Sequence, residues 1–245
     1  MGAVWSYLTD AMRHLTHEAN AISDNPIWVG ELVSNGNFHA EICAFSADLL
    51  AIVGAEIGAI SERRIALLMD TNLSQLPPFL TKNPGINSGM MLAHVTSSAL
   101  TSENKIYAHP ASIDSLPTSA NQEDHVSMAP FSGIKLLKLN QNLKYIIAIE
   151  TLVALQAIDL SHSLNTPLNK YYDLIRSEVS FMNEDRRIDK DIEKVLQTIN
   201  QPIYFDDIFE QFFGGANPFS GFASLIYSIT DPLTIPFRGI LPSPA

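Results

Sequence analysis

A long stretch without proline, from His39 to Asp70, constrains the fold more than any other feature of the sequence. It is rich in alanine, leucine, isoleucine and glutamate, and all of these except isoleucine are strong helix formers. Its middle is apolar on almost every side, with Gly54 and Gly58 four residues apart. A helix that is apolar all round is buried, and small residues allow a neighbouring helix to come close. The stretch therefore predicts one long core helix.

Other segments also predict helices. The segment His125–Asp159 predicts a second very long helix, with an irregularity near Pro130–Gly133. Ile27–Val33 is short and predicts extended backbone. Shorter helices are expected at Val4–Ala21, Ser88–Tyr107, Leu168–Ser180 and Asp189–Ile199. The fold class expected is all-α, a bundle of long helices with little or no sheet, whose length and apolarity indicate burial by other subunits as well.

Two segments lack this helical pattern. His109–Asp124 contains Pro110, Pro117 and many Ser, Thr and Asn residues, which indicate a loop. A polar loop of this length between long helices is often functional. Residues 201–245 hold seven Phe, six Pro and a single basic residue. We therefore divide the chain into a helical part, 1–200, and a divergent Phe- and Pro-rich tail, 201–245.

Charge and cysteine usage exclude several classes of function. The net charge of −11 provides no electrostatic basis for binding nucleic acid or anionic membranes. Cys43 is the only cysteine, so a reducing, cytoplasmic setting is expected. The apolar run Leu49–Ile60 is interrupted by Glu56, and we expect no membrane helix. His14 and His17 lack further ligands nearby, and no metal site is expected.

Three sets of motifs carry a resemblance to a known family, and together they extend from Met1 to about Asn200. The most specific motif is the unbroken run Thr118–Met128, Thr-Ser-Ala-Asn-Gln-Glu-Asp-His-Val-Ser-Met. The other motifs are Ala19–Pro26, Gly36–Glu41, Ser61–Ile65, Leu76–Leu80, Asn87–Met91, Ser102–Lys105 and His109–Ser115. The chain resembles the aromatic amino acid ammonia-lyases, and is closest to the C-terminal half of the bacterial histidine ammonia-lyases.

The resemblance implies a fold, an activity and a cofactor. It implies the tetrameric helical core of these enzymes, with active sites drawn from several subunits. The family converts an internal Ala-Ser-Gly tripeptide into a methylidene-imidazolone electrophile, so that no separately bound cofactor is required. The electrophile captures the substrate, a base removes a β-proton and ammonia leaves. With L-histidine as substrate, the product is urocanate.

The chain departs from the family in one large respect, since no Ala-Ser-Gly occurs in its 245 residues. The resemblance places that tripeptide, and an arginine that grips the substrate carboxylate, before Met1. We therefore expect a part of the lyase that needs an N-terminal half as partner and is inactive alone. A truncated gene model, a split gene and an internal start are all open explanations.

Four residues are candidates for the active site by this resemblance. Glu123 matches the catalytic position that faces the substrate side chain, where histidine-specific members carry glutamate. A carboxylate there suits an imidazole, because it accepts an N–H hydrogen bond and stabilises the charged ring. Phe38 matches an aromatic residue beside the electrophile, and Met91 and Gln122 match positions that line the substrate pocket. The alternatives are a solvated loop acid for Glu123 and plain core packing for Phe38 and Met91.

Two other functions stay open. One is a non-catalytic helical oligomerisation scaffold left by gene decay, which the unusual tail favours and the retained Glu123 and Phe38 disfavour. The other is a tyrosine-type ammonia-lyase half, against which Glu123 argues only moderately.

Overall fold

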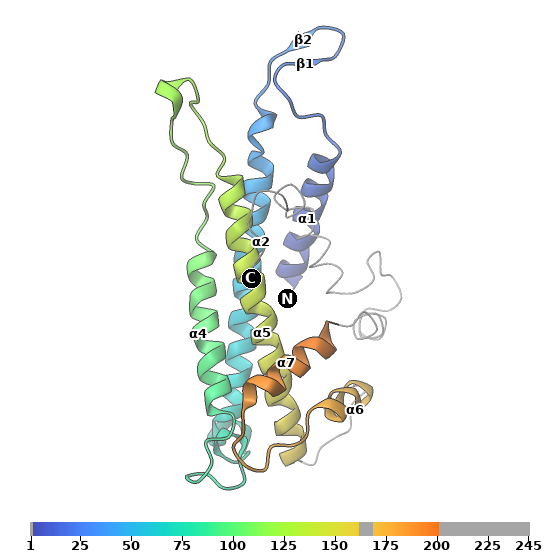
Figure 1. The fold of residues 1–245 in the computed structure, drawn as a ribbon, viewed down its shortest axis with the longest axis vertical. Coiled ribbons are helices and arrows are strands. Elements are labelled where there is room, and N and C mark those ends of the chain that lie inside the picture. Colours follow the sequence, from blue (N-terminus) through green and yellow to red (C-terminus); the bar gives the residue numbers. More distant parts are fainter. Residues whose placement is uncertain (1, 162–168, 201–245) are drawn as a thin grey trace. The chain divides into compact units, whose positions relative to one another are not determined.

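The computed structural model describes residues 2–161 and 169–200, and its fold is almost entirely helical (Figure 1). The tail proposed for 201–245 lies outside the described residues. The helices are α1 (Gly2–Ala19), α2 (Glu41–Met69), α3 (Thr71–Ser74), α4 (Met91–Tyr107), α5 (Ala129–Ser161), α6 (Asn169–Glu178) and α7 (Ile188–Ile199). Three short 3₁₀ turns accompany them, namely η1 (Asn37–His39), η2 (Pro78–Leu80) and η3 (Ser119–Asn121).

The two long helices confirm the main prediction from the sequence. Helix α2 has 29 residues and α5 has 33, whereas an average helix has about 11–12. The described sheet is a single hairpin of two short strands, β1 (Ile27–Trp28) and β2 (Leu32–Val33). Gly30 has a φ of +93° in the turn between them, a conformation that glycine adopts without strain.

The start of the second long helix differs from the prediction. We expected the helix to begin at His125 with an irregularity near Pro130–Gly133, but α5 begins at Ala129. Pro130 therefore lies in the first turn, where its missing N–H removes no helical hydrogen bond and its fixed φ suits the helix. The proline thus marks the beginning of the helix, and His125 belongs to the preceding loop.

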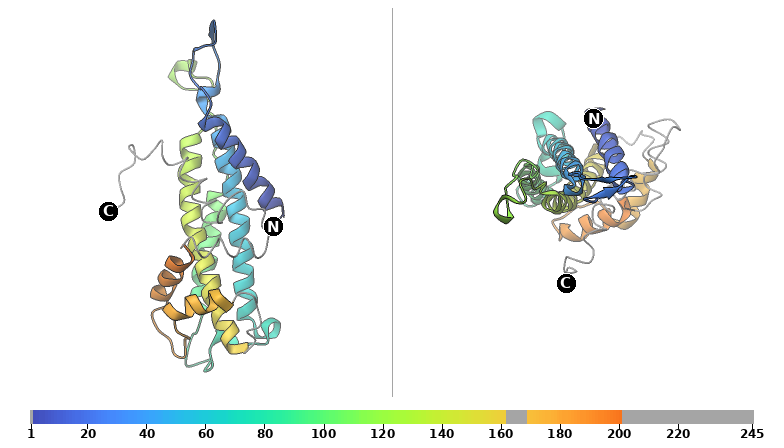
Figure 2. Two further views of the ribbon diagram at one scale, coloured as in Figure 1. Left: turned by 90° about the vertical axis from the view of Figure 1, so that its right-hand side faces the viewer. Right: turned by 90° about the horizontal axis from the view of Figure 1, so that it is seen from above.

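The described residues form two compact units. The first unit comprises residues 2–55 and 104–140, and the second comprises 56–103 and the described part of 141–200. In the first unit, α1 runs alongside α2 in both side views (Figures 1 and 2). The residues of α1 that are buried recur every three or four positions, as expected for one apolar helix face: Val4, Leu8, Ala11 and Leu15.

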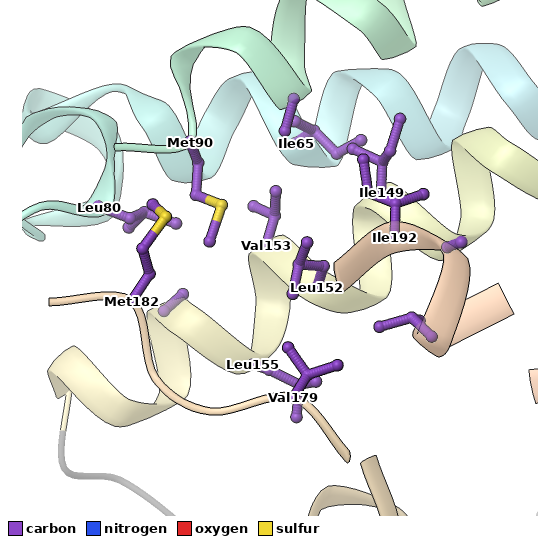
Figure 3. Close-up of a cluster of buried hydrophobic side chains, with 14 of the residues drawn as sticks. Ile65, Leu80, Met90, Ile149, Leu152, Val153, Leu155, Val179, Met182 and Ile192 are labelled. Atoms are coloured by element: carbon purple, nitrogen blue, oxygen red, sulfur yellow. The ribbon is translucent and has the colours of Figure 1, made fainter. Parts of the chain in front are cut away.

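The hydrophobic core of the second unit gathers side chains from several helices (Figure 3). Leu152 and Val153 of α5 lie at its centre, next to Ile65 of α2, and both are no more than 1% exposed. Met90 and Met182 approach Leu80 at one end of this core. Burying large aliphatic side chains in this way stabilises a fold by about 1.5–3 kcal/mol each.

One polar side chain in this core is fully used in hydrogen bonds. Gln156 is 1% exposed, and its amide donates to the carbonyl oxygens of Leu80 at 3.2 Å and Met182 at 2.9 Å. Its own oxygen accepts from the Met182 N–H at 3.1 Å. Because a buried amide is costly unless its groups are paired, Gln156 fixes the segment after α6 against α5.

Helix α2 is long enough and apolar enough to cross a membrane, which the sequence analysis did not expect. The stretch Asn37–Met69 contains a window with a mean hydropathy of 1.7, of which 56% is buried inside the structure. Mostly buried core helices of water-soluble proteins can have the same length and apolarity. A single helix of this kind is weak evidence for a membrane span.

Candidate active site

The Glu123 loop, defined as residues 108–128, connects α4 to α5 and carries two of the predicted site residues. Its tip folds into a narrow turn, in which Thr118 and Glu123 form an isolated antiparallel bridge. The Thr118 N–H donates to the Glu123 carbonyl oxygen at 2.8 Å, and the Glu123 N–H donates back at 3.3 Å. The backbone on either side of η3 is therefore held together by its own hydrogen bonds.

The turn between these two residues has unusual backbone geometry. Ser119, Ala120 and Asn121 have φ values of 52°, 56° and 67°. Non-glycine residues in this region cost of order 1–3 kcal/mol each, and such strain persists mainly at functional sites. The backbone is therefore strained immediately before Gln122 and Glu123.

The side chains of Gln122 and Glu123 are exposed. Within the described part of the chain, the Glu123 carboxylate forms no ion pair or side-chain hydrogen bond. An exposed carboxylate on a strained, hydrogen-bonded turn is free to accept an N–H from a ligand. Exposure alone is equally expected of a solvated loop acid, so the geometry leaves both interpretations of Glu123 open.

Phe38 lies in η1, directly before α2. Its ring is 42% exposed, and its centroid lies 4.2 Å from that of His39, with the planes inclined at 33°. The alternative of plain core packing is not provided for Phe38 by the described residues of this chain. Much of one aromatic side chain is left uncovered by the described residues of its own unit.

The structure brings the Phe38 segment and the Glu123 loop together within the first unit, at the start of α2 and α5 (Figure 1). The contact is made by His125. Its Nε2 lies 2.8 Å from a carboxylate oxygen of Glu41, and its ring meets that of His39 edge-on at 5.7 Å. From the sequence alone, His125 was expected to give structural support to its loop, but neither Glu41 nor His39 was singled out.

Met91, unlike the other three candidates, belongs to the second unit. It is the first residue of α4 and is partly buried. Its neighbour Met90 is 1% exposed and belongs to the core of that unit. Met91 therefore turns a different face from Met90, as adjacent residues at a helix start do.

A buried ion pair lies beneath the Glu123 loop and was missed by the sequence analysis. The Asp48 and Lys135 side chains are 4% and 7% exposed, with 2.9 Å between Oδ1 and Nζ. Lys135 also donates to the His109 carbonyl oxygen, and Asp48 accepts from the Ser112 N–H at 2.8 Å. Ser132 completes the set, with its hydroxyl 3.2 Å from Asp48. The pair thus fixes the beginning of the loop to α2 and α5.

The Asp48 carboxyl has a lowered pKa. Burial alone would raise it, but hydrogen bonds from the Ser112 backbone and from Lys135, together with the lysine charge, outweigh the burial. The carboxyl is therefore ionised in the folded protein at neutral pH. A charged residue inside an otherwise apolar helical stretch was the only sequence signal for this pair.

A second charged cluster lies in the second unit and is centred on Glu62, whose side chain is 6% exposed. It accepts from the Ser98 hydroxyl at 2.8 Å, contacts His94 at 3.1 Å and pairs with Arg63. Burial works against the charge on Glu62, but hydrogen bonds from Arg63, Ser98 and His94 lower its pKa overall. His94 thereby has a hydrogen-bonding role in this cluster.

The first unit contains an apolar groove of about 600 Å³ along the base of the Glu123 loop. None of the four predicted site residues lines it. Its walls come from the end of α4, the loop and the first turns of α5, and they include Ile106, Tyr107, Ile113, Met128, Phe131 and Ile134. This groove is therefore not a pocket around Glu123.

The described residues contain no group of three or more His, Cys, Asp or Glu side chains that could hold a metal ion. Cys43 lies on α2 and is partly buried. Burial, assisted by the nearby charge of Glu18, raises the pKa of its thiol. A thiol with a raised pKa is a weak nucleophile at neutral pH.

Comparison with known proteins points to one family. The family model for aromatic amino acid lyases matches residues 1–177. A histidine ammonia-lyase from Pseudoalteromonas atlantica is 56% identical over 199 residues, which are 79% of this chain and 39% of the relative. One from Burkholderia vietnamiensis is 52% identical over 206 residues, 82% of this chain and 41% of the relative.

Solved structures of two relatives share the fold. The histidine ammonia-lyase from Trypanosoma cruzi matches with a TM-score of 0.76 and 40% identity, over 96% of this chain and 45% of that one. A phenylalanine aminomutase from Pantoea agglomerans matches with a TM-score of 0.77 and 32% identity, over 81% and 40%. The chain thus spans about two fifths of the length of the curated relatives that it matches.

Proposed function

Because the chain belongs to the aromatic amino acid lyase family, we propose that it is the C-terminal part of a histidine ammonia-lyase, which deaminates L-histidine to urocanate. The observation that supports this most is the unbroken Thr118–Met128 motif, which the structure places on a strained turn with an exposed carboxylate. The identity of 52–56% to curated histidine ammonia-lyases supports histidine as substrate.

The proposal requires a second polypeptide segment. A methylidene-imidazolone group supplies an electrophile that activates the amine as a leaving group, and it forms from Ala-Ser-Gly, which these 245 residues lack. No residue of this chain can therefore form the group. We propose that an N-terminal half supplies it, that the assembly is a homo-oligomer as in the family, and that the chain is inactive alone. The exposed side chains of Phe38 and Glu123 fit a site completed by other segments.

Each candidate residue then has a defined role in the proposal. The Glu123 carboxylate accepts an N–H of the substrate imidazole, holds the ring in place and stabilises it when charged. The Gln122 amide offers a donor and an acceptor beside it. Phe38 and Met91 provide apolar surface that excludes water from the reacting atoms. A cytoplasmic location is part of the proposal, and its support is the presence of a single cysteine.

Two alternatives give different results in the same experiment. A helical scaffold would assemble without turning over any amino acid, and a tyrosine-type lyase would prefer tyrosine. The strain at the tip of the Glu123 loop disfavours the scaffold, since a decayed gene has no reason to keep it.

The proposed substrate can be tested with what we call the complemented lyase. This is the 245-residue chain produced together with an N-terminal half of a bacterial histidine ammonia-lyase that carries Ala-Ser-Gly. We expect kcat/KM for histidine to exceed that for tyrosine and phenylalanine by at least about 10²-fold, because a site built to hydrogen-bond an imidazole rejects rings that lack its N–H. Product formation is measured for each amino acid by ultraviolet absorbance. A preference for tyrosine would refute the histidine assignment.

A further inference from the structure

His125 connects the two segments of the first unit that carry predicted substrate-contacting residues. It lies two residues after Glu123, and its partner Glu41 lies three residues after Phe38. The distance from His125 Nε2 to Glu41 Oε2 is 2.8 Å. The His39 ring, which packs beside Phe38, lies edge-on to the His125 ring at an angle of 88°.

The hydrogen bonds around His125 have a consistent direction. An ionised carboxylate only accepts, so His125 Nε2 carries the proton that is donated to Glu41. His125 Nδ1 lies 3.2 Å from the Ser115 hydroxyl oxygen. That oxygen accepts a hydrogen bond from the Val126 N–H at 3.0 Å. The Ser115 hydroxyl hydrogen then remains for His125 Nδ1. A single ring proton, on Nε2, satisfies every group from Val126 through Ser115 and His125 to Glu41.

The contacts of His125 with Ser115 and Glu41 hold the Glu123 loop at residues outside the turn at its tip. The bridge between Thr118 and Glu123 fixes only the shape of the tip. Ser115 precedes the tip and His125 follows it, so their contact closes the loop below the tip. Glu41 then joins the closed loop to the first residue of α2.

We propose that His125 is a positioning residue, which holds Glu123 in a fixed place relative to Phe38 by closing the loop and tying it to α2. This inference rests on the proposed function of Glu123. It predicts that His125 acts through Glu123 and makes no independent contribution to the reaction.

A double-mutant cycle in the complemented lyase tests this dependence. We expect His125→Ala to lower kcat/KM for histidine roughly 10–100-fold, since a displacement of about 1 Å can cost that much. In a Glu123→Gln background the same change should have an effect within about threefold, because contacts that share one group are not additive. His125→Gln, whose amide can still donate toward Glu41, should recover part of the loss, and His17→Ala on the exposed face of α1 is the control.

The outcomes separate this inference from the function on which it rests. If Glu123→Gln turns over histidine at full rate, the proposed function of Glu123 is wrong and the inference fails with it. If Glu123→Gln lowers turnover, and His125→Ala lowers kcat/KM in that background by the same factor as in the parent, only the inference fails. Full activity of His125→Ala alone would also overturn it.

Hydrogen exchange on the 245-residue chain gives a readout that does not depend on activity. We expect His125→Ala to raise amide exchange in residues 115–126 by roughly fivefold or more, the effect of losing a hydrogen bond. Exchange within α2 and α5 should stay unchanged. Ser115→Ala, which removes the acceptor of the Val126 N–H, should have the same effect on the loop, and His17→Ala should have none. Unaltered loop exchange in both loop variants would overturn the inference.

Discussion

Glu123→Gln is expected to lower histidine turnover by the complemented lyase roughly 10²–10⁴-fold, the range for loss of one positioned acid–base or charge-stabilising group. The amide keeps the size of the side chain and one acceptor oxygen. It loses the negative charge, so it no longer stabilises a cationic imidazole or exchanges a proton at neutral pH. Turnover is measured by urocanate absorbance, and the relative rate with phenylalanine should rise.

The neighbouring acid provides a matched control for this substitution. Asp124 is also exposed and lies on the same loop, and Asp124→Asn removes one negative charge in the same way. We expect its turnover to stay within about threefold of the parent, because interactions of a solvent-exposed charge are weak. Both variants should elute at the size of the parent oligomer. A loss within threefold for Glu123→Gln would identify Glu123 as a solvated loop acid.

The largest effect on stability is expected from Lys135→Met. Breaking a buried pair by removing one partner typically costs about 3–5 kcal/mol, because the remaining charge is left uncompensated. Here the remaining charge is the Asp48 carboxylate, which is 4% exposed. Chemical denaturation of the 245-residue chain at neutral pH measures the change in the free energy of unfolding.

Two further variants separate the buried charge from the loss of a lysine. Lys138→Met makes the same substitution three residues later at an exposed position of α5, where only a contact with the Tyr107 ring at 5.9 Å is lost, and should change stability by about 1 kcal/mol or less. Asp48→Asn combined with Lys135→Met removes both charges, and should recover much of the loss. Equal destabilisation by Lys135→Met and Lys138→Met would contradict the assignment.

The Asp48–Lys135 pair makes the free energy of unfolding depend on pH. The pKa of Asp48 is lower in the folded chain than in the unfolded one, so its contribution is fully present above the unfolded value, about 3.9. It is lost as the pH falls through the folded value. In Lys135→Met the burial remains while the cation is gone, so the folded pKa rises. Stability should then decline at a higher pH than in the parent, which pH-dependent denaturation measures.

The long helices could be predicted from the sequence because their causes are local. The segment from His39 to Asp70 has no proline and is apolar on most sides, and a helix of nearly that length forms there. The start of α5 was misplaced because Pro130 was taken for an interruption, although a proline is favoured in a first helical turn. Helix ends depend on one or two residues, and are the least certain part of any such prediction.

The candidate site was only partly predictable for a different reason. Glu123, Gln122, Phe38 and Met91 came from motifs, and motifs name residues without their surroundings. The His125–Glu41 contact joins residues 84 positions apart, and the Asp48–Lys135 pair joins residues 87 apart. No periodicity or spacing connects positions so distant in the chain. Such contacts arise only when the helices pack, so the structure was needed to find them.

Urocanate formation tests the central claim most directly, that this chain is a histidine ammonia-lyase part which depends on an Ala-Ser-Gly segment. Purified 245-residue chain and complemented lyase are each incubated with L-histidine, and urocanate is followed by its ultraviolet absorbance. We predict steady formation by the complemented lyase and none above background by the chain alone. Urocanate from the chain alone would contradict the account, as would a folded complemented lyase that forms none.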